Sequence, residues 1–455
     1  MLSNSSKTKQ QNLFYSPLSD MLDMNDPLIA LSNAIDWEIF ENEFSQFYSK
    51  DGSPAKPIRL MVGLLILKQL ENLSDESIVI QWKRNPYYQY FCGYNEMQLC
   101  EPCHSTQLVK FRQRIGKKGM ELIFKVSVQL HGSCAEEQQV LIDTTVQEKN
   151  ITYPTDGKLA IKMIHHLHKI GKKEQLNLRR TFVKEIKEHR INLRFFKHPK
   201  KIKKARSSIK RLRTIVGILI RDISRNLKQD KLSNYTNTFD LFDKVRNQQI
   251  KDSNKVLSLH ESHVYAITKG KDHKKYEYGT KASIVATKDS GVIVGVASHS
   301  KNEHDSKTLE AALISANKTR TTAIKEVICD RGYRGIKEVL GTIISIPGTT
   351  LKKDTEYQKQ QKRDKFKRRA AIEPIIGHLK SDFRLARNYL KGFIGDQINL
   401  LLAATAWNLK KWMNIYFFAI ISGEMKLLLE SIKQIKLYNQ IFLQLIVIKL
   451  IFTHP

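Results

Sequence analysis

The sequence has few cysteines and few acidic residues for its length. Five cysteines occur in 455 residues, and their odd number and irregular spacing exclude a disulfide framework and favour a reducing compartment. Acidic residues number 45 against 76 lysines and arginines, which leaves a formal charge of +31. A chain with that excess is expected to meet a polyanion. Nucleic acid is the first candidate, and an anionic membrane surface is the second.

Long apolar runs are also lacking. The beginning of the sequence is polar and mixed in charge, without the apolar core of a signal peptide. The apolar stretch 441–452 is interrupted by Gln444 and Lys449 and is too short to span a bilayer. We therefore expect a cytoplasmic protein with no membrane partner, which in a bacterium lies beside the nucleoid.

One cysteine pair, Cys100 and Cys103, has the spacing of a zinc half-site and is followed by His104. A structural zinc ion needs four ligands, and the sequence offers no second pair. The pattern therefore favours no zinc site.

Hydrophobic periodicity divides the chain into successive regions. Residues 1–25 form a polar tail, and residues 26–133 have a helical pattern in which Ser74 is an expected N-cap. From residue 138 the pattern changes to that of strands, with helices between the later ones. The expected strands are 138–147, 276–287, 292–298, 326–330 and 342–347, and the expected helices are 306–317, capped by Asp305 or Ser306, 336–340 and 366–380. This order predicts an α/β, ribonuclease H-like domain over 134–412, with a helical extension of unassigned role over 413–455.

A long segment, 155–275, separates the first expected strand from the second. Within it, residues 158–213 contain 20 lysines and arginines against three acids, and the apolar residues recur with helical spacing. We expect a basic, mainly helical insertion that contacts phosphates. Its densest cluster is Lys200, Lys201, Lys203 and Lys204. The alternative is a basic face that is merely solvated.

Three acids occupy positions that suit one metal-dependent reaction. Asp143 and Asp330 each close an apolar run, and Glu373 lies in an expected helix. An acid at the end of a buried strand is costly unless it is paired. Two such aspartates and a helical glutamate can hold two divalent metals about 4 Å apart, which suits in-line displacement at phosphorus. The alternative for Glu373 is a set of salt bridges on an ordinary docking helix.

The residues around Glu373 share one face of that expected helix. At 100° per residue, Phe366, Arg369, Glu373 and Lys380 fall on one narrow stripe beside the apolar face. Pro374 follows the glutamate directly, so the helix either kinks there or begins close to Glu373.

The spacing of Arg369, Glu373 and Lys380 resembles the signature of bacterial insertion-sequence DDE transposases, with Phe366 at the position of the usual tyrosine. Phenylalanine keeps an aromatic surface and loses the hydroxyl. Further blocks, at 34–37, 57–63, 85–93, 269–271, 276–279 and 330–334, are similar to the insertion-sequence-five group. The resemblance runs from about residue 26 to residue 412.

The resemblance implies a function and roles for these residues. Asp143, Asp330 and Glu373 would be the catalytic triad and would hold two Mg²⁺ ions, for which Mn²⁺ can substitute. Phe366, Arg369 and Lys380 would contact double-stranded DNA at the element end. The implied enzyme cuts element ends and joins them to target DNA, acts as a homodimer or larger assembly, and uses residues 26–133 for end recognition or dimerisation. Two alternatives stay open: a domesticated nuclease that cannot join strands, and an inactivated copy that only binds DNA.

Overall fold

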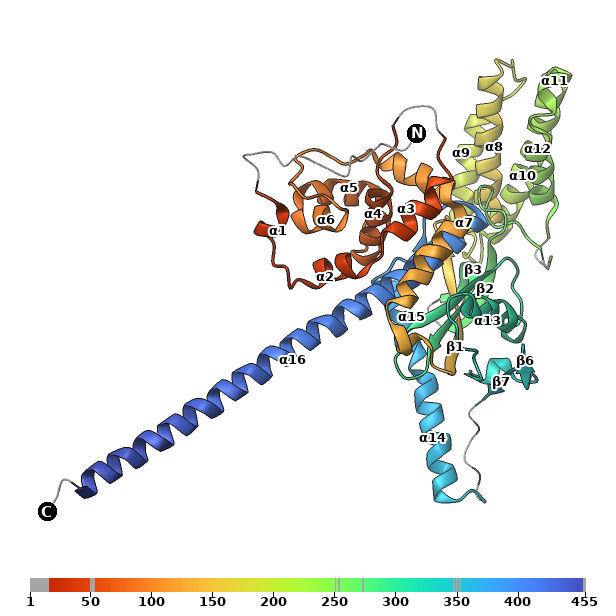
Figure 1. Cartoon of the computed structure of the whole chain (residues 1–455). Coiled ribbons are helices and arrows are strands. Elements are labelled where there is room, and N and C mark those ends of the chain that lie inside the picture. Colours follow the sequence, from red (N-terminus) through yellow and green to blue (C-terminus); the bar gives the residue numbers. More distant parts are fainter. Residues whose placement is uncertain are drawn as a thin grey trace.

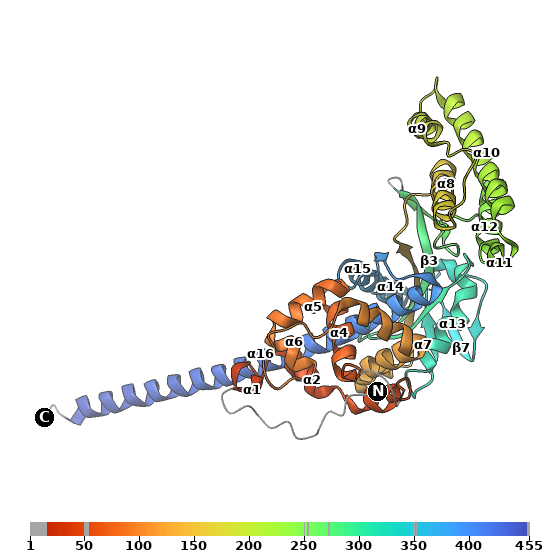
Figure 2. The same cartoon turned by 90° about the horizontal axis from the view of Figure 1, so that it is seen from above.

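The structure is a computed structural model that describes residues 16–49, 54–249, 251–252, 254–271, 274–346, 348, 351 and 353–452; the side chains of 269–271, 274, 366 and 424–452 lie outside that description. Figures 1 and 2 show three parts: a group of N-terminal helices, a central sheet, and a helical arm that projects from the sheet. The predicted helical N-terminal region is confirmed.

The N-terminal helices are α1 Leu18–Met21, α2 Pro27–Ala34, α3 Glu38–Ser45, α4 Ile58–Leu70, α5 Asp75–Arg84, α6 Pro86–Phe91 and α7 Ser105–Gln129. Several of these helices are capped at their N-termini by a side-chain oxygen, as the sequence predicts for α5. The Ser74 hydroxyl accepts a hydrogen bond from the Ser77 amide, which satisfies one of the free N–H groups of the first turn. Helix α7 is interrupted at Gly116, whose φ is 56°.

The strands are β1 Gln139–Lys149, β2 Tyr265–Lys271, β3 Lys274–Thr287, β4 Ile293–His299, β5 Glu326–Ile328, β6 Glu338–Val339, β7 Thr342–Ser345 and β8 Arg387–Asn388. They form one mixed sheet, in which β4, β3, β1, β5 and β7 lie side by side in that order. The pairs β4–β3 and β3–β1 are antiparallel, whereas β1–β5 and β5–β7 are parallel. The predicted strands 138–147, 276–287, 292–298, 326–330 and 342–347 thus all have a counterpart.

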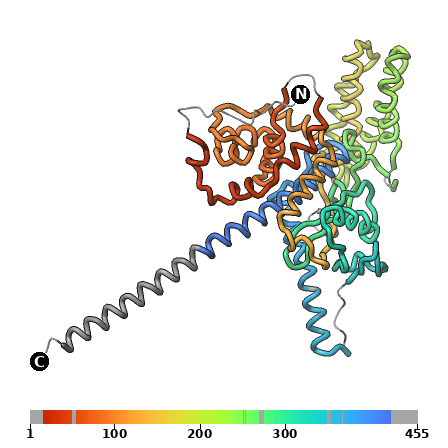
Figure 3. Tube along the Cα trace, viewed as in Figure 1, coloured from red at the N-terminus to blue at the C-terminus, as the bar shows by residue number. Residues whose placement is uncertain are grey.

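The N-terminal helices and the sheet share one hydrophobic core. The first part of helix α16, Gly392–Phe452, belongs to this core and lies against α7, α4 and β4 (Figure 3). On the sheet, α13, Leu309–Asn317, lies so close to β4 that a Cβ atom on Gly295 would be 2.7 Å from the Ala316 backbone nitrogen. In the described part of the chain, no helix combines the length and the apolar character that crossing a bilayer requires.

Three local expectations were wrong. The expected helix 336–340 is instead a hairpin of β6 and β7, turned by Leu340 and Gly341 with φ values of 52° and 74°. Two consecutive positive φ values suit a tight hairpin, and strand pairing outweighs the helical pattern. Strand β2 lies inside the segment expected to be helical, where pairing with β3 holds it. The expected helix 306–317 begins as a short 3₁₀ turn capped by His304 rather than by Asp305 or Ser306.

The expected helix 366–380 is two helices, α14 Glu356–Ala370 and α15 Ile372–Ser381. Pro374 lies in the first turn of α15, where its missing N–H leaves no intrahelical hydrogen bond unmade. Of the two alternatives for Pro374, a helix that begins close to Glu373 is the one observed.

The arm lies between β1 and β2 and comprises α8 Asp156–Lys173, α9 Val183–Asn192, a 3₁₀ turn at Leu193–Phe195, α10 Ile202–Asn226, α11 Gln229–Leu232 and α12 Thr236–Asn247. Its apolar faces form a core of their own, which includes Leu167, Val216 and Phe242 and is separate from the main core. Figure 1 places the arm and α14 at opposite ends of the sheet.

Candidate active site at the strand ends

The sheet topology brings Asp143 and Asp330 to neighbouring positions. Strands β1 and β5 are parallel and pair Leu141 with Ile328. Asp143 lies two residues after Leu141, and Asp330 lies two residues after Ile328. Continuing the parallel register by two residues therefore places the two aspartates side by side. Both are half-buried, and Asp330 caps a 3₁₀ turn, Arg331–Tyr333, whose Gly332 amide donates to its Oδ1 over 2.8 Å.

Helix α15 is docked against the same two strands. Ile372 is almost fully buried in a small cluster with Leu141 and Ile328, so the residue before Glu373 touches the strands that carry both aspartates. The Glu373 carboxylate itself is 59% exposed and accepts a hydrogen bond from Arg369 Nη2 over 2.8 Å. Within the described residues, no group of three histidine, cysteine, aspartate or glutamate side chains lies close enough to hold a metal ion.

A further acid, Asp305, lies beside the two aspartates. A Cβ atom built on Gly332 would be 3.0 Å from Asp330 Oδ1 and 3.2 Å from Asp305 Oδ2, so the two carboxylates face the same glycine. Asp305 Oδ1 accepts hydrogen bonds from Thr144 Oγ1 and from Lys281 Nζ, each over 2.9 Å. From the sequence we expect only a capping role for Asp305, because its partners Thr144 and Lys281 are far from it along the chain.

The aspartates concentrate negative charge around Tyr333. This side chain is fully buried, and its hydroxyl lies beside Thr308 without a hydrogen bond of good geometry to any described residue. Burial raises the pKa of Tyr333, and the charges of Asp305, Asp143 and Asp330 raise it further. Burial also raises the pKa of Cys329 to about 12, with the same direction of effect from Asp330 and Asp143, so this thiol stays protonated and inert.

The predicted DNA contacts are dispersed over the molecule. Arg369 lies in the last turn of α14 and Lys380 near the end of α15, whereas the side chain of Phe366 is outside the described part. The lysine cluster is exposed at the start of α10, and Lys201 Nζ lies 4.4 Å from the centre of the Phe195 ring. The predicted contacts thus come from two parts of the fold, α14 and α15 beside the sheet and the start of α10 in the arm.

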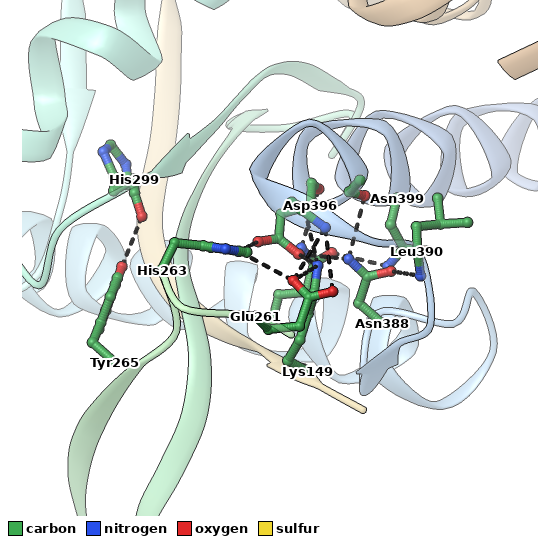
Figure 4. A network of polar contacts seen from close by, with 12 residues as sticks. Lys149, Glu261, His263, Tyr265, His299, Asn388, Leu390, Asp396 and Asn399 are labelled. Carbon is green, nitrogen blue, oxygen red and sulfur yellow. Dashed lines mark hydrogen bonds and ion pairs between the residues drawn. The ribbon is translucent and has the colours of Figure 1, made fainter. Parts of the chain in front are cut away.

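At Lys149, the last residue of β1 and six residues beyond Asp143, a buried charge network joins three segments (Figure 4). Lys149 contacts Asp396 of α16 and lies 3.6 Å from Glu261 Oε2. The second Asp396 oxygen lies 3.0 Å from His263 Nε2. The network fastens β1, the chain returning from the arm and the start of α16 to one another.

Two family descriptions match this chain. Residues 16–114, the N-terminal helices, match a family described as a transposase domain (DUF772). Residues 252–409 match a family described as a transposase DDE domain, and this range contains Asp305, Asp330 and Glu373.

Individual relatives are similar over parts of the chain. An uncharacterized protein of Rhizobium meliloti, ORF8 in the nfe locus, is 36% identical over 194 residues, which cover 42% of this chain and 94% of the relative. Among solved structures, the piggyBac transposase in a synaptic complex with hairpin DNA aligns with 75% of this chain at 9% identity and a TM-score of 0.25. The chain covers about half of that protein, 54%. The chain thus matches two transposase families over successive ranges, a transposase domain over its N-terminal helices and a transposase DDE domain over residues 252–409.

Proposed function

We propose that this protein cuts the ends of an insertion element and joins them to target DNA by two-metal phosphoryl transfer. The observation that carries the proposal is the parallel register that sets Asp143 beside Asp330, with α15 and its Glu373 docked on the same strands. The strand order β4–β3–β1–β5–β7, with its antiparallel and parallel halves, supports a ribonuclease H-like catalytic domain over 134–412. The motif blocks support the insertion-sequence-five group, which stays a prediction.

The residues at the strand ends fit divalent metal ions such as Mg²⁺ or Mn²⁺. Their donors are carboxylate oxygens, which hard divalent cations prefer, and the Tyr333 hydroxyl beside them has no good partner. The two ions would be held by Asp143, Asp330 and Glu373. When bound, such ions neutralise charge on the reacting phosphate and activate the oxygen that attacks the phosphorus atom. Glu373 would have to turn from Arg369 to do so.

The remaining residues of the chain position DNA in this mechanism. Arg369 and Lys380, with Phe366, would hold the backbone near the scissile phosphate, so that catalysis is mainly positioning and neutralisation of charge. The basic arm would hold the duplex through phosphates. We assign residues 26–133 to end recognition or dimerisation. A dimer is expected because joining two ends requires at least two copies of the active site.

The test is cleavage of a duplex that carries the element end. We expect nicking at the end in Mg²⁺ or Mn²⁺ and none in EDTA, followed by joining of pre-cut ends to a target duplex. Nicking without joining would favour the domesticated nuclease. Tight binding with no nicking in any divalent metal would contradict the proposed enzyme and favour an inactivated copy that only binds DNA.

The lysine cluster of the arm yields a separate prediction. Changing Lys200, Lys201, Lys203 and Lys204 to glutamine removes up to four phosphate contacts, so the log–log salt dependence of DNA affinity should flatten by up to ~3.6. Element-end and random duplexes should weaken by similar factors, because phosphates carry no base identity. Affinity measured from low to moderate salt checks this. An unchanged slope would show that these exposed lysines are only solvated.

A further inference from the structure

The arm contains a second concentration of positive charge, in a hollow of about 610 Å³ between the segment before α9 and the exposed side of α10. Five arginines and one aspartate supply its charged lining, with Phe182 and Ile218 as its apolar part. The arginines are Arg179, Arg180, Arg211, Arg221 and Arg225. Arg221 and Arg225 lie one turn apart on the same face of α10, whereas Arg179 and Arg180 come from the preceding loop.

Most of these guanidinium groups have no anionic partner. Arg211 is neutralised by Glu185, which accepts from its Nε over 2.5 Å and from its Nη2 over 3.3 Å. Asp222, the one acid in the hollow, accepts a hydrogen bond from the backbone amide of Arg179 over 3.0 Å. Within the described part of the chain, the other four arginines form no ion pair; they are Arg179, Arg180, Arg221 and Arg225.

The backbone around the hollow is held in place despite this repulsion. Asp222 of α10 fixes the loop through the Arg179 amide, and the Phe182 ring packs against the core of the arm. Phe182 has a φ of 55°, a left-handed conformation that residues other than glycine seldom adopt. Helix α9 begins directly after it without a side-chain cap, so its positive end adds to the charge of the arginines. Four cations brought together between this anchored loop and α10 indicate a site for an anion.

We propose that this arginine hollow is a binding site for the phosphodiester backbone of duplex DNA. The choice of duplex DNA as the polymer rests on the proposed function. A guanidinium group presents a rigid fork of N–H donors that matches two phosphate oxygens, and it remains charged at any physiological pH. The lysine cluster at the start of α10 is not part of the lining of this hollow.

The experiment changes Arg221 and Arg225 to glutamine in the full-length protein. Loss of two phosphate contacts should weaken duplex affinity about 30-fold at 0.15 M salt and flatten the log–log salt slope by about 1.8. The matched control changes Arg190 and Arg194, which are exposed on the same arm but do not line the hollow, and should leave the slope unchanged. If the first variant fails to fold, Arg179→Gln with Arg180→Gln tests the same hollow from its loop side.

Two outcomes would overturn the proposal. Equal losses in the hollow variant and the Arg190 and Arg194 control would show that diffuse charge, not the hollow, binds DNA. Saturable binding of inorganic phosphate that the variant abolishes, with duplex affinity unchanged, would show a site for a small anion instead. Cleavage in Mg²⁺ at saturating DNA distinguishes this proposal from the proposed function. The hollow variant should still cleave under these conditions. A wild-type protein that binds DNA without cleaving it would refute only the proposed enzymatic activity.

Discussion

Asp330→Asn should abolish metal-dependent cleavage of the element end, by roughly 10³-fold or more, while duplex affinity stays close to that of the wild type. In the proposed mechanism the carboxylate after β5 would hold metal, whereas DNA affinity would come from lysines and arginines elsewhere. Asparagine is nearly the same size, and its amide oxygen can still accept the hydrogen bond from the Gly332 amide. The turn after β5 should therefore keep its shape. Cleavage and binding are measured on one end fragment in Mg²⁺.

A matched control for this variant is Asp382→Asn. Asp382 is an exposed aspartate after α15 that pairs with His378 over 2.8 Å, and it lies outside the proposed catalytic and DNA-binding groups. The Asp382→Asn variant should cleave and bind the end fragment like the wild type. Retained cleavage by Asp330→Asn would remove this residue from the active site, and a joint loss of binding and of thermal stability would indicate a damaged fold.

The second large effect is expected at the buried network in Figure 4. Lys149→Met should lower the free energy of unfolding by about 3–5 kcal/mol, the cost typical of breaking a buried ion pair on one side. Methionine fills a similar volume, but it leaves Asp396 and Glu261, both almost fully buried, with His263 as their remaining basic neighbour. The loss is measured as the shift of the urea unfolding transition, followed by circular dichroism.

Lys391→Met is the control for the replacement of a lysine by methionine as such. Lys391 is exposed and lies just before α16, close in sequence to the network, so its replacement should alter stability by less than about 0.5 kcal/mol. Equal shifts for the two variants would contradict the view that the network fastens β1 to α16.

The strand-end aspartates were accessible to sequence reasoning because a run of apolar residues that ends in an acid is a local pattern. Asp143 and Asp330 follow such runs, and parallel pairing then places them together. Asp305 was not accessible as a site residue, since its local pattern is that of a helix cap. Its partners, Thr144 and Lys281, meet it only after β1, β3 and β4 have paired.

The arm shows the same limit at a larger scale. Its helices follow from apolar periodicity, and its lysine cluster is conspicuous because the four residues are nearly consecutive in the sequence. The arginine hollow joins residues 179–180 to residues 221–225, which meet through the packing of the arm and not through sequence proximity. Strand β2 was missed for a related reason, since pairing with β3 stabilises a segment whose own pattern is weak.

The position of the arm has a consequence for how its size can vary. The arm connects β1 to β2, and both of these strands pair with β3. The pairing is tight: β1 and β3 pair Gln147 with Thr280, and a Cβ atom on Gly279 would lie 1.9 Å from the Gln147 carbonyl oxygen. The entropy of closing a loop grows only with the logarithm of its length, so doubling the connection between these strands costs about 0.6 kcal/mol. A connection with its own core need not draw on the packing of the sheet. Segments can therefore be added to or removed from the arm at little thermodynamic cost to the sheet, which makes its reach along DNA free to change while the strand-end aspartates keep their register.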